Sequence, residues 1–238
     1  MKISVCITTF NGEKYIKQQL HSILAQLDEN DEIIISDDSS VDNTVKIIKI
    51  FNDIRIKIFE NNKFRNPIYN FENALIKATG DYIFLSDQDD VWLPNKVNIL
   101  KSCLQKYDLV ISDAFVVDEN LNILHDSFYA LNNSKNGVIK NLLKNSYIGC
   151  CMAFRSNLLP LVLPFPKNIP MHDWWIGLIA EFQGKVFFCE DKLVYYRRHG
   201  SNISPTAGKS SYNFFKKIKF RLLLMQNLFL RLTTTTIW

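Results

Sequence analysis

The chain has 238 residues, enough for one α/β domain with a large core, and its formal charge is +4. Its five cysteines have no C-x-x-C spacing, and Cys150 and Cys151 are adjacent, which excludes a disulfide scaffold and favours a reduced, cytoplasmic setting. The first apolar stretch is too short for a signal peptide or a membrane span and is expected to be a buried strand.

Strand and helix patterns alternate through the first 86 residues, which predicts an α/β fold with a mostly parallel, Rossmann-like sheet covered by helices on both faces. Apolar runs predict strands at 3–8, 32–36, 55–59 and 82–86. Helical spacing of the apolar residues predicts helices between them, at about 12–26, 45–51 and 67–80.

The second half is less regular. Helices are predicted at about 94–107 and 173–182, strands at 109–112, 147–154, 186–188 and 193–196, a hairpin at 116–121 and a polar loop at 132–136. Gly149 lies inside one of these strands, where a bulge and the close approach of a substrate explain it equally well. The segment 205–208 is expected to end the compact part, giving a domain at 1–204 and a tail at 205–238.

Three of the predicted strands end in polar runs, which are Thr8-Thr9-Phe10-Asn11-Gly12, Asp37-Asp38-Ser39-Ser40 and Asp87-Gln88-Asp89-Asp90. Each run taken alone is typical of a turn or a helix cap. Parallel strands, however, bring their carboxyl ends to one edge of the sheet, where ligands bind. Clustered carboxylates repel each other without a cation, so this edge predicts a divalent metal, Mg²⁺ or Mn²⁺.

The eight glycines form neither G-x-G-x-x-G nor a P-loop, which excludes a dinucleotide fingerprint and a Walker-type site. A nucleotide would then be bound by carboxylates and a metal. Asp37 or Asp38 can accept a hydrogen bond from a pyrimidine imide, Asp87 can reach a ribose hydroxyl, and Asp89 can hold the metal against a diphosphate.

Five motifs between residue 3 and about residue 204 resemble family 2 glycosyltransferases with a GT-A fold. They are Thr8-Thr9-Phe10-Asn11, Asp37-Asp38-Ser39-Ser40-Val41-Asp42, Ser86-Asp87-Gln88-Asp89-Asp90-Val91-Trp92, His172-Asp173-Trp174-Trp175 and Arg198-His199-Gly200-Ser201-Asn202. The resemblance implies inverting transfer of a sugar from a nucleotide-diphosphate donor. It implies nucleotide contacts from Thr8, Phe10, Asn11, Asp37, Asp38 and Asp87, and metal ligation by Asp89 and His199.

The same resemblance implies that Asp173 is the general base, at a position where relatives often carry Glu-Asp in place of His172-Asp173. From the sequence alone, a helix N-cap explains Asp173 about as well. Arg198 is a candidate phosphate contact and Trp174 a candidate sugar contact, with core packing as the alternative for one of the two adjacent tryptophans. The motif around Asp87 resembles that of rhamnosyltransferases, which implies dTDP-L-rhamnose as donor, a UDP-sugar being the other candidate.

The tail is basic and amphipathic. Residues 192–238 carry nine Lys/Arg and no acidic residue, which leaves 19 basic and 24 acidic residues in the rest of the chain. A helical stripe beside Lys216, Lys217, Lys219 and Arg221 consists of Phe214, Ile218, Leu222, Met225, Phe229 and Leu232. This pattern favours peripheral binding to the inner face of a membrane and a lipid-linked saccharide acceptor. Packing on the domain or on a partner helix is the alternative, and no nucleic-acid partner is expected.

Two other functions are considered. A nucleotidyltransferase shares an α/β nucleotide fold and a metal aspartate, but it usually needs a glycine-rich loop with a basic residue after the first strand, which residues 8–13 lack. A catalytically idle, membrane-associated subunit is disfavoured because Asp87, Asp89 and Asp173 are all present.

Overall fold

The computed structural model describes residues 1–200 and 213–235. The strands are β1 Ile3–Thr9, β2 Glu32–Asp37, β3 Ile56–Phe59, β4 Tyr82–Asp87, β5 Val91–Trp92, β6 Leu109–Val117, β7 Ile123–His125, β8 Met152–Arg155 and β9 Val186–Arg197. The helices are α1 Ile16–Leu24, α2 Thr44–Ile50, α3 Pro67–Lys77, α4 Lys96–Cys103, α5 Phe128–Asn132, α6 Val138–Leu143, α7 Leu159–Val162, α8 His172–Gln183 and α9 Phe214–Thr235, with 3-10 turns η1 Gly149–Cys151 and η2 Ser156–Leu158.

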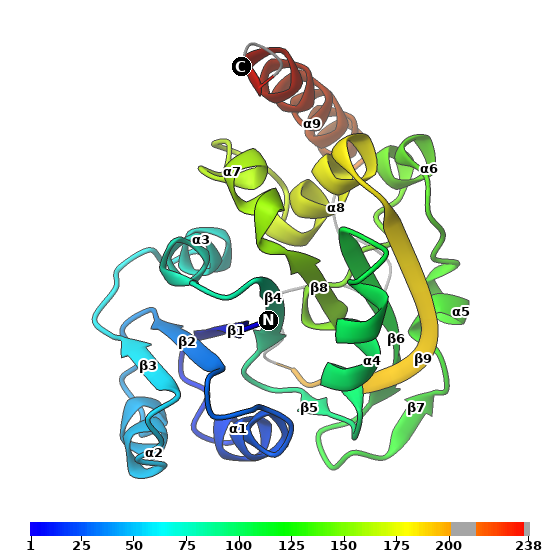
Figure 1. The fold of residues 1–238 in the computed structure, drawn as a ribbon. Coiled ribbons are helices and arrows are strands. Elements are labelled where there is room, and N and C mark those ends of the chain that lie inside the picture. The colour runs from blue at the N-terminus through cyan, green and yellow to red at the C-terminus, as the bar shows by residue number, and fades with distance from the viewer. Residues whose placement is uncertain (201–212, 236–238) are drawn as a thin grey trace.

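A curled sheet runs through the molecule between two layers of helices (Figure 1). Its strand order is β3-β2-β1-β4-β8-β6-β9-β5, with β7 paired to β6. Strands β1 to β4 pair in parallel, as do β6 and β9, whereas β5, β7 and β8 pair antiparallel with their neighbours. The predicted α/β class is therefore confirmed.

The register of the first strands places their polar ends together. Strand β1 is apolar along most of its length because helices cover both of its faces, and its Ile3, Val5 and Ile7 are fully buried. Thr8 lies opposite Asp87 on β4, and Thr9 lies opposite Asp37 on β2. The sheet edge predicted from the three polar runs is thus formed by β1, β2 and β4.

Two expectations for the second half are wrong. The segment 147–154 is not one strand, because Gly149–Cys151 form the turn η1 and β8 begins at Met152. An apolar run does not distinguish a buried turn from a buried strand, and Gly149, Cys150 and Cys151 are all buried. The separate strands at 186–188 and 193–196 are one continuous strand, β9, which carries exposed charged residues at 190 and 191.

The predicted hairpin at 116–121 is confirmed, since β6 and β7 pair antiparallel around a turn in which Asp118 accepts hydrogen bonds from the backbone of Asn120 and Asn122. The short helices α5, α6 and α7 were not predicted. They have five, six and four residues, too few for a helical repeat of apolar side chains to emerge.

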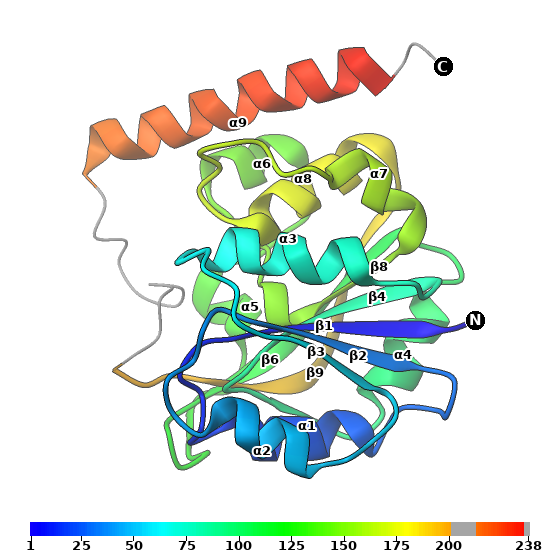
Figure 2. The ribbon, with the colours of Figure 1, turned by 90° about the vertical axis from the view of Figure 1, so that its left-hand side faces the viewer.

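The predicted tail helix is α9, which lies across one side of the molecule as an outer layer over α6, α7 and α8 (Figure 2). Its Leu224 and Leu228 are buried against the domain. The expected end of the compact part at 205–208 lies outside the described residues. None of the described helices combines the length and the apolar composition that crossing a bilayer requires.

Candidate functional site

The loop after β2 is fixed to the end of β1 by Asp37. Its carboxylate accepts hydrogen bonds from the Thr9 hydroxyl at 2.7 Å, the Ser40 amide at 2.9 Å and the Ser40 hydroxyl at 2.6 Å. Neighbouring Asp38 accepts one from the Phe64 amide at 2.7 Å. Both carboxylates are buried, and the bonds of Asp37 hold the two loops rigidly together.

Gln88 connects the loop after β4 to the loop after β1. Its side-chain amide accepts a hydrogen bond from the Phe10 N–H at 2.9 Å and donates one to the Phe10 carbonyl at 3.1 Å. A Cβ on Gly12 would lie 2.2 Å from the Gln88 Oε1, so this contact requires glycine. The Phe10 ring is half exposed beside it, and Asn11 adopts a left-handed conformation while its side chain accepts from the Val41 amide.

Asp89 and His199 meet although 110 positions separate them in the sequence. The His199 Nε2 lies 2.8 Å from the Asp89 Oδ2, and the imidazole packs on the Tyr15 ring with centroids 4.9 Å apart. A carboxylate beside an imidazole is a donor set that Mn²⁺ and Mg²⁺ accept together with phosphate oxygens. The residues present therefore fit the predicted divalent metal.

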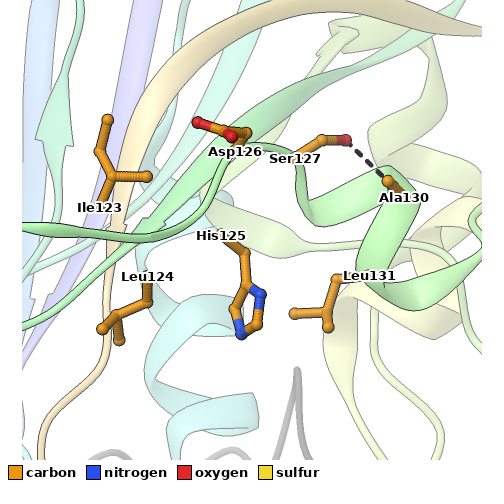
Figure 3. Close-up of a pocket in the computed structure, with 7 residues that line it drawn as sticks. All are labelled: Ile123, Leu124, His125, Asp126, Ser127, Ala130 and Leu131. Carbon is orange, nitrogen blue, oxygen red and sulfur yellow. Dashed lines mark hydrogen bonds between the residues drawn. The ribbon is translucent and has the colours of Figure 1, made fainter.

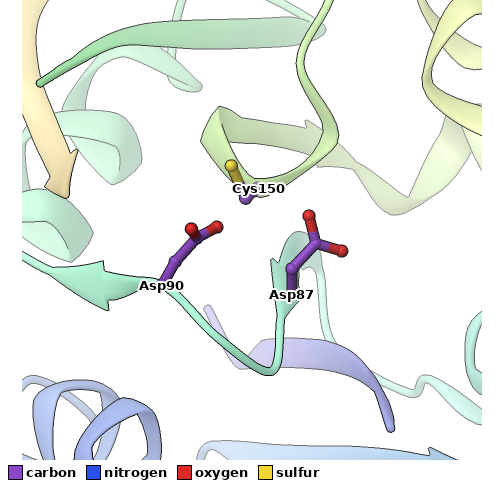
Figure 4. Close-up of side chains that lie close together, drawn as sticks. All are labelled: Asp87, Asp90 and Cys150. Carbon is purple, nitrogen blue, oxygen red and sulfur yellow. The ribbon is translucent and has the colours of Figure 1, made fainter. Parts of the chain in front are cut away.

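A second group lies deeper at the same loop. The carboxylates of Asp87 and Asp90 converge with the Cys150 thiol (Figure 4), with ligand atoms all within 4.8 Å of one another. The Asp90 Oδ1 accepts from the Arg197 amide, whereas its Oδ2 has no hydrogen-bond partner among the described residues. Burial, with repulsion from Asp89 and Asp173, raises the pKa of Asp87 to about 7. Burial also raises the pKa of Asp90 well above its ordinary value.

Lys96 supplies positive charge beneath these carboxylates. Its side chain is fully buried, donates to the Cys150 carbonyl at 2.7 Å and lies 4.5 Å from the centre of the Trp92 ring. Burial lowers the pKa of Lys96, while Asp90 and Asp87 oppose that shift. A buried lysine in this place compensates part of the carboxylate charge.

Asp173 lies in the first turn of α8 and is buried. The N-cap position is Met171, so the helix-cap interpretation of Asp173 does not hold. Burial raises the pKa of Asp173 to about 7, opposed by hydrogen bonds from the Trp174 and Gly149 amides and the Asn145 side chain. The negative charge of Asp173 contributes to the raised pKa of Asp87, so the two carboxylates repel each other.

The residues next to Asp173 are packed into the protein. His172 stacks on Phe71 with centroids 4.0 Å apart, and burial lowers the pKa of His172 to about 3, so its ring is neutral. The Trp174 indole N–H donates to the Asn141 carbonyl, and its ring remains partly exposed. Trp175 is fully buried, which confirms core packing for one of the two tryptophans.

The orientation of α8 depends on Gly177, which packs against the ring of Tyr147. A Cβ at position 177 would lie 2.5 Å from three ring atoms of this fully buried tyrosine. We expect Gly177→Ala to lower the free energy of unfolding by about 1–3 kcal/mol, measured by urea denaturation, because the core is overpacked. The matched control is Gly200→Ala, since no atom lies within 4 Å of its added Cβ. Equal stability of both variants would contradict this packing.

Arg197 is a buried residue at the site that the sequence did not single out, whereas the phosphate contact predicted for Arg198 stays a prediction. The Arg197 guanidinium is buried and donates to the Asp89 carbonyl at 2.6 Å, the Glu119 carbonyl at 2.5 Å and the Gln18 side chain at 2.7 Å. It also covers the Tyr15 ring at 4.5 Å. Arg198 donates to the Tyr196 hydroxyl at 3.4 Å. Two adjacent arginines at a strand end carry no signal that distinguishes the buried one.

A hollow of about 540 Å³ lies elsewhere, between β7 and α5 (Figure 3). Its lining contains none of the predicted site residues and consists of Ile123, Leu124, His125, Asp126, Ser127, Ala130 and Leu131. The carboxylate edge and not this hollow brings the predicted residues together.

Two bacterial proteins are similar to nearly the whole chain. A dTDP-rhamnosyl transferase, RfbG of Shigella flexneri, is 30% identical over 220 residues, covering 82% of this chain and 72% of its own length. WfgD of Escherichia coli, a UDP-Glc:alpha-D-GlcNAc-diphosphoundecaprenol beta-1,3-glucosyltransferase, is 27% identical over 232 residues, covering 91% of this chain and 82% of its own length.

Solved structures share the fold. S. aureus TarS 1–349 in complex with UDP-GlcNAc superposes with a TM-score of 0.72 at 18% identity, covering 95% of this chain and 67% of that one. The mannosyltransferase PcManGT of Pyrobaculum calidifontis, in complex with GDP-Man and Mn²⁺, superposes with a TM-score of 0.63 at 18% identity, covering 93% of this chain and 62% of that one. The expected GT-A fold is therefore confirmed.

The family model for glycosyl transferase family 2 matches residues 4–160, which include the loops after β1, β2 and β4. This match covers more than half of the chain, and the similarity to named transferases extends beyond it through α8 and β9. The chain is a glycosyltransferase that belongs to family 2.

Proposed function

We propose that the chain transfers a sugar, with inversion, from a nucleotide-diphosphate donor to a saccharide hydroxyl. The observation that carries the proposal is geometric: the Cys150 thiol lies with the carboxylates of Asp87 and Asp90, and the preceding Gly149 packs against Asp173, where an added Cβ would lie 3.7 Å from the Asp173 Cβ. We propose that this proximity brings the nucleotide contact Asp87 and the base Asp173 to one site, as a displacement at an anomeric carbon requires.

Asp173 is the proposed general base. In the reaction its carboxylate accepts the proton of the acceptor hydroxyl while that oxygen forms a bond to the anomeric carbon. The bond from this carbon to the diphosphate breaks on the opposite face, and the nucleoside diphosphate leaves with the electron pair. A pKa of about 7 suits this role, because the group is a stronger base than an ordinary carboxylate yet is ionised near neutral pH.

Asp89 and His199 are the proposed metal ligands. Their 2.8 Å contact shows that both side chains reach one point at the loop after β4. A divalent ion bound there supplies positive charge to the departing diphosphate. Arg198 follows the end of β9 next to His199, and we assign it a phosphate contact in the same proposal.

The nucleotide is proposed to lie along the edge formed by β1, β2 and β4. Asp38 is the better candidate for the base imide, because the oxygens of Asp37 already accept three hydrogen bonds within the protein. The exposed Phe10 ring and the neighbouring Thr8 and Asn11 are proposed to line the nucleotide, and Asp87 to accept from the ribose. Because the Trp174 indole N–H already donates to the Asn141 carbonyl, a sugar would contact the face of the Trp174 ring.

The proposed donor is dTDP-L-rhamnose or a UDP-sugar, and the proposed acceptor is a surface polysaccharide or a lipid-linked oligosaccharide. Support comes from the similarity to one transferase named for dTDP-rhamnose and to another that acts on a diphosphoundecaprenol-linked sugar. Such an acceptor would place the chain on the cytoplasmic side of a membrane.

Calorimetry of the full chain against a panel of UDP- and dTDP-sugars, with and without Mn²⁺, tests the proposal. We expect metal-dependent binding of one donor, and release of its nucleoside diphosphate when a saccharide acceptor is added. Absence of metal-dependent binding to any donor would favour an idle subunit. Release of pyrophosphate from a nucleoside triphosphate and a sugar phosphate would favour a nucleotidyltransferase instead.

A further inference from the structure

Helix α9 is packed on the domain by one face only. Leu224 and Leu228 are buried, and Arg231 donates to the carbonyls of Leu161 and Leu163 at 3.0 and 2.7 Å and lies over the Trp175 ring. Nearer its start, the Arg221 guanidinium donates to the Leu143 carbonyl at the end of α6. These contacts fix how the helix is rotated about its axis, so the face turned away from the domain is defined.

One exposed flank of α9, beside the face that packs on the domain, carries a row of apolar side chains. Phe214 is 71% exposed, Leu222 60% and Phe229 68%, and Ile218 and Met225 lie between them on the same face. Residues at these spacings of three and four are neighbours on a helix surface. Isolated exposed apolar side chains are ordinary on a soluble protein, but a row of five along a helix is typical of a surface that something covers.

The charge of α9 indicates what covers this stripe. The helix contains five Lys/Arg and no Asp or Glu. The side chains of Lys216 and Lys219 are exposed, on the part of α9 that also carries Phe214 and Ile218. A purely basic helix with an apolar face is complementary to an anionic bilayer, where the apolar side chains enter the boundary region and the cations stay among the headgroups.

The position of α9 suits this role. Figure 2 shows that its basic N-terminal end lies on the side of the molecule where β9 ends, and the carboxyl ends of β1, β2 and β4 point to the same side. A membrane against the exposed stripe would therefore contact a helix whose basic end lies on the same side of the molecule as the carboxylate edge.

We propose that the exposed stripe of α9, defined as Phe214, Ile218, Leu222, Met225 and Phe229, is a docking surface for an anionic lipid bilayer. Binding to a membrane would bring the chain close to the lipid-linked acceptor of the proposed function. The docking surface itself is inferred from α9 alone. The helix would lie in the plane of the interface, with its inner face still packed on α6 and α8.

Sedimentation of the full chain with vesicles tests the surface. We expect binding to vesicles that contain phosphatidylglycerol, little binding to phosphatidylcholine alone, and weakening by salt. The double variant Lys216→Gln/Lys219→Gln should bind about 25-fold more weakly, because each basic side chain near an anionic surface contributes about a fivefold factor. Leu222→Ser/Phe229→Ser should lose most of the remaining affinity.

Lys46→Gln and Ile54→Ser are matched controls, since both are exposed and lie near α2 on the opposite side of the sheet. They should bind vesicles like the unaltered chain. Equal binding by all variants, or no binding to anionic vesicles, would overturn the proposal. Dimerisation that Leu222→Ser/Phe229→Ser abolishes, without vesicle binding, would assign the stripe to a second copy instead.

The enzymatic proposal is tested separately, by donor binding without vesicles. The α9 variants should retain metal-dependent donor binding, because no residue of the stripe lies among the proposed nucleotide or metal contacts. Vesicle binding without donor binding would support the docking surface and contradict the proposed function. Donor binding without vesicle binding would support the proposed function and contradict the docking surface.

Discussion

Replacing Asp173 by Asn is expected to slow sugar transfer by about 10²–10⁴-fold while donor affinity stays unchanged, because the variant loses a general base and keeps the size of the side chain. Steady-state transfer and donor titration by calorimetry measure the two quantities. Asp126→Asn is the control, since it removes an exposed carboxylate outside the candidate site. Transfer by Asp173→Asn within a few-fold of the unaltered chain would exclude Asp173 as the base.

The pH dependence gives a second check on the same residue. Because the pKa of Asp173 is raised to about 7, the carboxyl is protonated below that pH and cannot accept a proton. Activity should therefore fall about tenfold per pH unit below pH 7 and level off above it. An activity plateau that extends down to pH 5 would show that the base ionises like an ordinary aspartate.

Stability should change with pH in the opposite sense. The folded state holds the Asp173 proton more tightly than the unfolded state, so this stabilisation is complete below about pH 4 and is lost as the pH rises through about 7. Urea denaturation of the metal-free protein between pH 5 and pH 8 should show a shallower decline for Asp173→Asn than for the unaltered chain. The decline that remains in the variant is assigned to Asp87 and Asp90, because burial also raises the pKa of both of these carboxyls.

Replacing Asp89 by Asn is expected to abolish the metal dependence of donor binding and to reduce transfer by about 10²–10³-fold. The physical reason is the loss of an ionised oxygen ligand and, with it, of the charge that stabilises the leaving diphosphate. Calorimetry with and without Mn²⁺ measures the first effect. Asp28→Asn, which removes a strongly exposed carboxylate after α1, is the control.

His199→Ala should act through the same ion. If Asp89 and His199 share one metal, the losses in the double variant should be smaller than the product of the two single losses, since removing either ligand already weakens the site. Independent, multiplying losses would place the metal elsewhere, for example at Asp87, Asp90 and Cys150.

The parallel half of the fold was predictable because its information is local. Strands β1, β2 and β4 are short apolar runs followed by polar residues, and their predicted starts agree with the structure, although β1, β2 and β4 each extend one residue further. The shared sheet edge followed from strand direction alone. For the same reason, the meeting of Thr9 with Asp37 was within reach of sequence reasoning.

The second half was less predictable because its structure depends on distant contacts. The turn η1 is held by a hydrogen bond from Lys96, 54 positions earlier in the chain, and nothing in the apolar run 147–154 indicates it. The burial of the Arg197 side chain depends on which side of β9 faces the loop after β4, which only tertiary packing decides. The position of Cys150 beside Asp87 and Asp90 also depends on η1, which contains Cys150.

The buried guanidinium of Arg197 restricts which sequence changes the surrounding loops can accept. Its donors reach Asp89 after β4, Glu119 between β6 and β7, and Gln18 on α1, so one side chain serves three segments. Lysine carries a compact charge and lacks the planar fork of arginine. Even Arg197→Lys is therefore expected to lower the free energy of unfolding. Because the acceptors on Asp89 and Glu119 are backbone carbonyls, substitutions there leave these two hydrogen bonds possible, whereas an insertion or deletion that moves either loop would break them.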